Sequence, residues 1–166
     1  HFTRTISGLT PGTLYFYKVA HADFSGATPG SNGEVPADLN GQIKLHFYEL
    51  DSGSWTDGWS PSNSSRVGYD DSNQFDWELV GQFNGWPGTL DPLYAMTDEG
   101  NGLHTGTFSF ATPGTYPFKF RKQGSWDTSI GADFGDPSEN NEFTVATAGD
   151  TWRFELDLPH GRWRSF

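Results

Sequence analysis

Hydrophobic and polar positions alternate in two segments of the second half of the chain, a pattern typical of strands with one buried face. In the first segment aromatic residues occupy every second position: Tyr116, Phe118 and Phe120. In the second segment the apolar positions are Trp152, Phe154, Leu156 and Leu158. The intervening positions are Pro117, Lys119, Arg121, Arg153, Glu155 and Asp157. We therefore expect two strands, each with one face in the core and the other in water.

Two copies of a turn motif lie at matching places in the two halves of the chain. Thr-Pro-Gly stands at residues 10–12 and again at residues 112–114, each time between two segments with strand patterns. Proline fixes φ and glycine permits the left-handed conformation, so both motifs predict a tight change of chain direction. The strand expected after each turn carries one lysine among aromatic residues, Lys18 in the first case and Lys119 in the second.

These turns belong to a longer internal repeat. The segment from Ile43 to Phe47 matches the segment from Trp152 to Leu156 in its order of apolar and polar residues, and Trp55 and Trp163 follow at similar places. Strand order is kept while loop lengths differ, as expected of two copies of one fold. The repeat has the length of a small β-sandwich domain.

The two copies differ in completeness. Residues 77–166 hold a full set of expected strands, opening with Trp77-Glu-Leu-Val-Gly-Gln-Phe-Asn-Gly-Trp86, whereas residues 1–55 hold only the second half of a sandwich. Residues 56–76 are rich in Ser, Asp, Asn and Gly and are predicted to be a linker or long loop. A half sandwich leaves strand edges open. We expect either that the sequence is a fragment of a longer protein or that another chain completes this half.

Composition agrees with an all-β protein and narrows the partners. Aromatic residues, Gly and Pro are frequent, and no long stretch is rich in helix-forming residues. The net charge of −11 is unfavourable for nucleic acids and anionic membranes, which require clustered Lys and Arg. No apolar run is long enough to cross a bilayer, and the absence of Cys excludes disulfides and thiolate metal sites. Low lysine content and polar loops suggest an extracellular or cell-surface protein.

Five segments, read in order, resemble a known family: Leu79–Trp86, Met96–Gly102, Pro113–Phe120, Gly124–Asp127 and Glu139–Asn141. Together they are similar to the glycogen-binding modules of AMP-activated kinase β subunits and of glycogen-branching and debranching enzymes. They also resemble the tandem domains of outer-membrane starch-binding lipoproteins. The resemblance covers residues 77–166 and implies an antiparallel, immunoglobulin-like β-sandwich that binds carbohydrate without cleaving it.

The resemblance also implies a binding site. In such modules two Trp residues stack on an α-glucan while a Lys and an Asn bond its hydroxyls, and the matching residues here are Trp86, Lys119, Trp126 and Asn140. The stretch between Trp86 and Lys119 is longer than usual, and Pro87-Gly88 follows the first Trp directly, which would reshape the site. The first copy keeps Lys18 but has Phe24 at the place of the second Trp, so we do not expect it to bind sugar alone.

Structural roles compete with this reading of each residue. Trp77 and Trp152 are expected in the core and Trp163 in the core or at its edge, and Trp86 and Trp126 could equally fill a core or a domain interface. Lys119 could be a solvated strand lysine, and Asn140 a turn former. Five aspartates could gather on calcium, but no loop has a calcium-binding spacing, so a solvated acidic linker is favoured: Asp51, Asp57, Asp70, Asp71 and Asp76.

Two functions of different classes remain open at this point. The first is a non-catalytic module that binds an α-glucan-type oligosaccharide or polysaccharide, with no cofactor and no metal. The second is a structural repeat of an extracellular filament, adhesin or surface layer, in which copies of the chain associate by strand addition at the half sandwich. No catalytic motif or pair of carboxylates across a cleft supports an enzyme.

Overall fold

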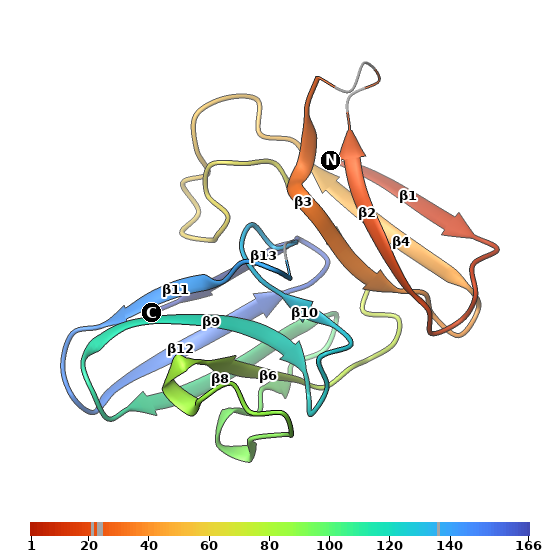
Figure 1. Ribbon diagram of the computed structural model, residues 1–166. Helices are drawn as coiled ribbons and strands as arrows, with labels where there is room; N and C mark the ends of the chain where they lie inside the picture. Colours follow the sequence, from red (N-terminus) through yellow and green to blue (C-terminus); the bar gives the residue numbers. More distant parts are fainter. Residues whose placement is uncertain (21, 23–24, 136) are drawn as a thin grey trace.

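Strands form nearly all of the regular structure in the computed structural model, which describes residues 1–20, 22, 25–135 and 137–166 (Figure 1). All strand pairs are antiparallel, and the only helical elements in these residues are short 3₁₀ turns. The expected all-β class is therefore correct. Below, residues 1–69 are the N-terminal unit, residues 77–166 the C-terminal unit, and residues 70–76 the connecting segment.

One layer of the C-terminal unit is built around the long strand β9 (Gly114–Lys122). Strand β6 (Trp77–Gly81) pairs with one edge of β9. The other edge of β9 pairs with β10 (Ser129–Ile130) and β11 (Asn141–Val145). Strand β6 runs antiparallel to β9, so it ends beside Phe118 while β9 ends beside Trp77, and the loop after β6 folds back to reach Arg121 near the end of β9.

The second layer of the C-terminal unit has the strand order β13-β12-β8-β7. Its central pair is β8 (Leu103–Phe110) and β12 (Asp150–Asp157), flanked by β7 (Thr97–Asp98) and β13 (Arg162–Ser165). The Thr-Pro-Gly segment at 112–114 carries the chain from β8 in this layer to β9 in the other. Side chains between the layers form the core.

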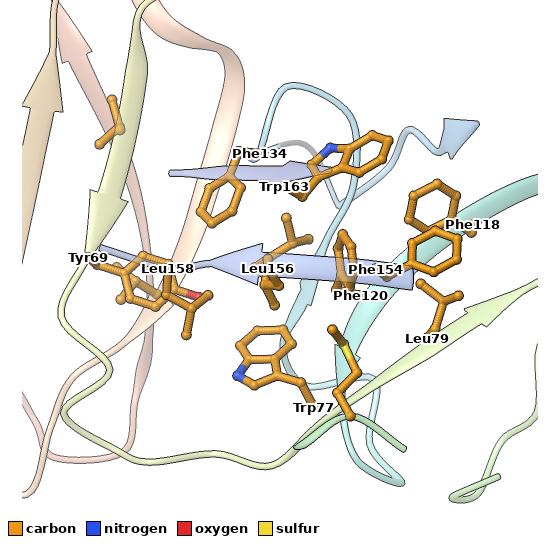
Figure 2. Close-up of a cluster of buried hydrophobic side chains, with 14 of the residues drawn as sticks. Tyr69, Trp77, Leu79, Phe118, Phe120, Phe134, Phe154, Leu156, Leu158 and Trp163 are labelled. Carbon is orange, nitrogen blue, oxygen red and sulfur yellow. The ribbon is translucent and has the colours of Figure 1, made fainter. Parts of the chain in front are cut away.

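Aromatic side chains dominate the core between the two layers (Figure 2). Phe118 of β9 and Phe154 of β12 are fully buried, and their ring centroids lie 5.5 Å apart in an edge-to-face arrangement. Trp163 of β13 also packs edge-to-face on Phe118. Alternation therefore predicted the inward faces of β9 and β12 correctly. The residues labelled around this cluster are Tyr69, Trp77, Leu79, Phe118, Phe120, Phe134, Phe154, Leu156, Leu158 and Trp163.

The outward faces of these strands differ from the prediction. Arg121 is fully buried, and Lys119, Glu155 and Asp157 are each only 8% exposed, although alternation placed all four in water. Loops cover the outer face of β9, and the arginines of β13 cover β12: Arg121 bonds the carbonyls of Pro87 and Thr89, while Glu155 pairs with Arg164. A period of two identifies which residues share a face but not what covers that face.

The N-terminal unit has one sheet in the order β1 (Phe2–Ser7), β4 (Gln42–Tyr48), β5 (Arg66–Tyr69). A second sheet pairs β2 (Leu14–Ala20) with β3 (Ala27–Pro36). Strand β5 lies inside residues 56–76, which the sequence predicted to be a linker or long loop, so part of that segment is regular structure. Strand β5 is only four residues long and is flanked by segments rich in Ser and Asn, so its short pattern was not recognised in the sequence.

The pairing order of the N-terminal unit parallels that of the C-terminal unit. Strands β1, β4 and β5 pair as β8, β12 and β13 do, and β2 pairs with β3 as β9 pairs with β11. The first Thr-Pro-Gly segment likewise carries the chain between two sheets, from β1 to β2. Among the residues that the structure describes, no strand pairs with β2 in the way that β6 pairs with β9.

The two units touch along a seam where backbone meets backbone. The amide of Tyr69 donates to the carbonyl of Leu158 at 3.0 Å, and Ser60 forms an isolated antiparallel bridge with Trp163. Gly68 and Gly161 lie on this seam, and a Cβ on Gly68 would overlap the Pro159 carbonyl. Figure 1 shows the loop before β5, coloured yellow, extending toward β13. Close approach of this kind fixes the two units relative to each other.

Candidate functional site: a paired tryptophan surface

Trp86 lies in a tight turn directly after β6. The 3₁₀ helix η1 (Gln82–Asn84) ends at Gly85 in the left-handed conformation, and the side-chain oxygen of Asn84 accepts from the Gly81 amide at 2.9 Å. The Trp86 amide then donates to the Gly81 carbonyl at 3.1 Å. Trp86 has a φ of 53°, which is uncommon for a residue with a bulky side chain and costs conformational energy. The turn therefore holds this indole in a defined place.

Trp126 lies in the turn after β9. The amide of Lys122 donates to the Thr128 carbonyl at 3.0 Å and the amide of Ser125 donates to the Lys122 carbonyl at 3.1 Å, which closes the turn. Gly124 provides the left-handed position that such a turn requires, with φ at 69°. The Trp126 side chain is 44% exposed, a large value for so apolar a group.

The two indoles meet at the surface. Their ring centroids lie 6.2 Å apart and their planes are inclined by 38°. Trp86 is half-buried and Trp126 is exposed. Two turns that are 40 residues apart in sequence thus place a continuous, slightly bent aromatic surface against solvent. A surface of this kind matches the apolar C–H face of a pyranose ring.

A buried ion pair lies beneath this aromatic surface. Arg121 and Glu78 are both fully buried, and Glu78 Oε1 accepts from Arg121 Nε at 3.0 Å and from Nη2 at 2.6 Å. The two residues face each other across the β6–β9 pair. A buried pair is tolerated only when its remaining donors and acceptors are satisfied, and the loops of the site supply the missing partners.

Both tryptophan loops are bonded to this ion pair. Arg121 Nη1 donates to the Pro87 carbonyl at 2.6 Å and Nη2 donates to the Thr89 carbonyl at 3.1 Å, which fixes the loop after Trp86. Glu78 Oε1 accepts from the Gly124 amide at 2.8 Å, which fixes the turn before Trp126. The ion pair therefore sets the distance between the two loops.

Trp126 also covers the ion pair directly. The guanidinium carbon of Arg121 lies 4.4 Å from the centroid of the Trp126 ring, a cation–π contact. One face of the indole packs against Arg121, so only the remainder of the ring is exposed to solvent. Trp126 therefore both packs on the buried ion pair and contributes to the exposed aromatic surface.

Lys119 and Asn140 lie on the neighbouring part of the same layer. Lys119 is buried, and its ammonium donates to the Pro137 carbonyl. Asn140 is exposed and immediately precedes Asn141, whose Cα partner is Phe118, so it lies at the level of Lys119. Lys119 is thus not a solvated strand lysine. The geometry brings Trp86 and Trp126 into contact and places Lys119 beside the segment that carries Asn140.

The other tryptophans that were expected in the core are buried to different degrees. Trp77 is 1% exposed and Trp163 is 8% exposed, as predicted. Trp152 is only half-buried and packs against the edge of the core, with its ring centroid 5.8 Å from that of Phe143. It lies near the start of β12.

The acidic residues considered for calcium are mostly engaged by basic side chains. Asp57 pairs with Arg66 at 2.6 Å, and Asp70 pairs with Lys44 at 2.9 Å. Asp71 lies 3.2 Å from His104. Within the described residues no cluster of His, Asp or Glu could hold a metal ion. These carboxylates fasten the connecting segment and its neighbours to the sheets.

Asp57 illustrates the electrostatic role of these pairs. Hydrogen bonds from Arg66 hold the pKa of the Asp57 carboxyl well below its ordinary value, outweighing the opposing effect of burial. Arg162 of β13 reaches the same carboxylate at 3.3 Å. Asp57 therefore links β5 of the N-terminal unit to β13 of the C-terminal unit.

Among the described residues of the N-terminal unit, no pair of tryptophans corresponds to Trp86 and Trp126. The ammonium of Lys18 donates to the Gly30 carbonyl at 2.7 Å, so the lysine that matches Lys119 also ties its strand to a loop. Phe24, which the repeat aligns with Trp126, lies outside the described residues. No strand in the described residues corresponds to β6, and with it the position of Trp86 is missing.

Sequence reasoning missed Glu78 and Arg121 as the residues that organise the site. A signal was present, because each is a charge in the middle of a strongly apolar strand: Trp-Glu-Leu-Val in β6 and Phe-Arg-Lys in β9. Opposite charges at such positions on neighbouring strands suggest a cross-strand pair. The repeat analysis did not use this signal because the N-terminal unit has no counterpart of β6.

Comparisons of the chain with protein-family models, with curated proteins and with solved structures found no match. Among the described residues, no helix has the length and apolar character needed to cross a membrane.

Proposed function

We propose that the C-terminal unit binds a neutral α-glucan-type carbohydrate without cleaving it, as a module of a protein that acts outside the cell or at its surface. The observation that carries the proposal is the contact between Trp86 and Trp126 at the surface, where their ring centroids lie 6.2 Å apart. Two inclined aromatic rings can each cover the apolar face of one sugar in a curved chain. The buried ion pair keeps the rings in place before binding, which lowers the entropic cost of association.

Polar groups of the same layer would orient the sugar. The exposed amide of Asn140 can both donate to and accept from sugar hydroxyls. Lys119 would act mainly by holding the chain around Pro137, and thereby Asn140, at the surface. The family resemblance of Trp86, Lys119, Trp126 and Asn140 supports the same assignment.

The proposal is tested by calorimetric titration of the whole chain with maltoheptaose. We expect Trp86→Ala to lower the affinity by about tenfold or more, since burying one large aromatic side chain contributes roughly 1.5–3 kcal/mol and 1.4 kcal/mol is tenfold. Phe2→Ala is the matched control, because Phe2 is an aromatic residue that is 65% exposed in the N-terminal unit. Absence of binding by the wild-type chain at millimolar sugar would refute the proposal.

Strand addition between copies of the chain is a second candidate function. An apolar groove of about 370 Å³ opens between the two sheets of the N-terminal unit, lined in part by Phe2, Ile6, Val19 and Phe47. Phe2 and Ile6 are 65% and 40% exposed. In the C-terminal unit β6 occupies the corresponding edge, which indicates the kind of strand that fits. We propose a second copy of this chain as the occupant.

Association of this kind would be head-to-tail and would lengthen with concentration. Light scattering behind size exclusion should then show a mass that rises across a concentration series, and electron microscopy should show filaments. Ile6→Lys places a charge in the groove and should return the chain to a monomer. A wild-type chain that stays monomeric at millimolar concentration would exclude strand addition and leave the carbohydrate proposal untouched.

A further inference from the structure

We propose that the carbohydrate site continues past Trp126 into a groove between the two units, so that the N-terminal unit binds the distal part of a long neutral glucan chain. This inference rests on the proposed function, because it assumes that Trp86 and Trp126 hold the first sugars. It adds a second binding region, to which residues of the N-terminal unit and of the connecting segment contribute.

The groove begins at Trp126 itself. Its volume is about 470 Å³, within the range of roughly 300–1,000 Å³ that small-molecule sites occupy. One wall is formed by Trp126, Asp127 and Lys122 of the C-terminal unit. The other wall includes Leu14 of β2 and Glu34 of β3. Since Trp126 also contacts Trp86, the aromatic surface and the groove are continuous.

The floor of the groove comes from the connecting segment. Phe75 lines it, and the ammonium of Lys122 lies 4.4 Å from the centroid of the Phe75 ring. Two backbone-anchored bonds hold this segment in place: the Gln123 amide donates to the Asp76 carbonyl at 2.9 Å, and the Asn73 side chain donates to the Pro36 carbonyl at 3.1 Å. The groove is therefore built by residues that are fixed before any ligand binds.

The lining has the mixed character that a sugar chain requires. Leu14 and Phe75 supply apolar surface, while the carboxylates of Glu34 and Asp127 can accept hydrogen bonds from pairs of sugar hydroxyls. Two carboxylates beside one ammonium, in a chain with a net charge of −11, disfavour sulfated or uronic-acid polymers. The geometry thus points to a neutral polysaccharide rather than a charged one.

Chain length is the property that separates this inference from the proposed function. A short oligosaccharide can occupy only the surface of Trp86 and Trp126, whereas a longer one reaches Leu14 and Glu34. Binding should therefore be tighter for maltoheptaose than for maltotriose, with the gain arising from the N-terminal unit. Calorimetric titration of the whole chain with both sugars measures this gain, and we expect at least tenfold.

The tighter binding of maltoheptaose over maltotriose should disappear when one residue is substituted in each wall of the groove. In Leu14→Ala/Asp127→Ala the maltoheptaose affinity should fall about tenfold toward the maltotriose value, while maltotriose binding is unchanged. Lys122→Met, which keeps the apolar stem over Phe75, provides a second variant if the first is unstable by thermal melting. Trp86→Ala, by contrast, should weaken both sugars.

The outcomes distinguish the two claims. A wild-type chain that binds maltotriose and maltoheptaose equally, or groove variants that retain the full gain, would overturn the groove and leave the paired tryptophan site standing. A wild-type chain that binds neither sugar would overturn both. Loss of maltotriose binding in the groove variant would also count against the groove as a separate region.

Discussion

Glu78 and Arg121 are the residues on which the geometry of the paired tryptophans depends. Removing two charges from water costs several kcal/mol for each ion, so such a pair is retained only where it is fully bonded. Here Glu78 accepts from Arg121 and from the amides of Asp91 and Gly124, and Arg121 in turn bonds two loop carbonyls. The pair thereby fixes the loop after Trp86 and the turn before Trp126 relative to each other.

Glu78→Gln is predicted to weaken both stability and the proposed sugar binding. Glutamine keeps the size of the side chain but leaves the buried guanidinium of Arg121 without a countercharge, so the free energy of unfolding should fall by about 3–5 kcal/mol. Urea denaturation and maltoheptaose titration measure the two effects. Glu142→Gln, on the exposed face of β11, is the matched control and should change stability by less than about 0.5 kcal/mol. A stable Glu78→Gln variant would contradict the assigned role.

Glu155 makes the stability of the sandwich sensitive to acid. Burial alone would raise the pKa of its carboxyl, but hydrogen bonds from Arg153 and Arg164 outweigh burial and lower the pKa below its ordinary value of 4.5. A lowered pKa in the folded state contributes stability above about pH 4.5, and this contribution is lost as the pH falls further. The stability advantage of the wild type over Glu155→Gln should therefore shrink as the pH falls below about 4.5.

Calorimetric melting at pH 7, 5, 4 and 3 measures that difference in Tm. The comparison with Glu155→Gln isolates the one carboxylate, since all other acidic groups are shared by the two proteins. A difference in Tm that stays constant across this range would show that Glu155 is not held ionised by its arginines.

At the level of single residues, sequence patterns predicted contacts within a strand better than contacts across loops. The burial of Phe118, Phe154 and Trp77 follows from alternation and side-chain type, and it was predicted correctly. The burial of Arg121 depends on which loops cover β9, and this is decided by tertiary structure. For the same reason Lys119 was placed in solvent, although it donates to a carbonyl of the 137–140 loop.

At the level of elements, Gly68 in β5 and Gly161 before β13 let two backbones approach along the seam. A Cβ on either residue would overlap backbone atoms of the other unit. Glycine is therefore required at these positions by close packing, and at Gly161 also by its φ of 60°.

Gly68→Ala is predicted to destabilise the protein and to reduce the proposed gain for long sugars, because the added methyl group pushes β5 away from Pro159. Overpacking of this kind typically costs 1–3 kcal/mol, measured by urea denaturation. Gly30→Ala serves as the control, since a Cβ there meets open space. In that variant stability should be unchanged or slightly increased, because alanine restricts the unfolded chain. Equal effects of the two substitutions would argue against a tight seam.

Element boundaries were predictable where the turn chemistry is strong. The Thr-Pro-Gly motifs at 10–12 and 112–114 lie between consecutive strands of different sheets, as the sequence predicts, whereas the same three residues at 28–30 lie inside β3. Strand β5 was missed, because four residues between polar loops carry too short a pattern to be recognised. Its pairing with β4 is a long-range property that periodicity does not report.

For the whole molecule, the hydrophobic core does not stop at the seam. Buried side chains of the N-terminal unit, such as Val35 and Leu45, belong to the same cluster as Trp77 and Phe118 of the C-terminal unit. Shared burial of this kind couples the folding of the two units. The division into residues 1–55 and 77–166 therefore describes the repeat pattern and not two independent cores.

A single cooperative unfolding transition is the expected result for the complete chain. Because the units share a core and an ion-pair network at Asp57, neither should unfold while the other stays folded. Tryptophan fluorescence and far-UV circular dichroism should give the same urea midpoint, and the calorimetric and van't Hoff enthalpies should agree. Two separated transitions would show that the seam contributes little to stability.

The position of Trp126 over Arg121 has a consequence for how this surface can change in evolution. The indole covers a buried charge on one side and faces solvent on the other, so under the proposed function one side chain serves both folding and sugar binding. A library of all residues at position 126, sorted only for folded protein, should return mostly flat aromatic residues even in the absence of sugar. Substitutions that change ligand preference would then accumulate at position 86 and along the groove, where the side chains do not cover a buried charge.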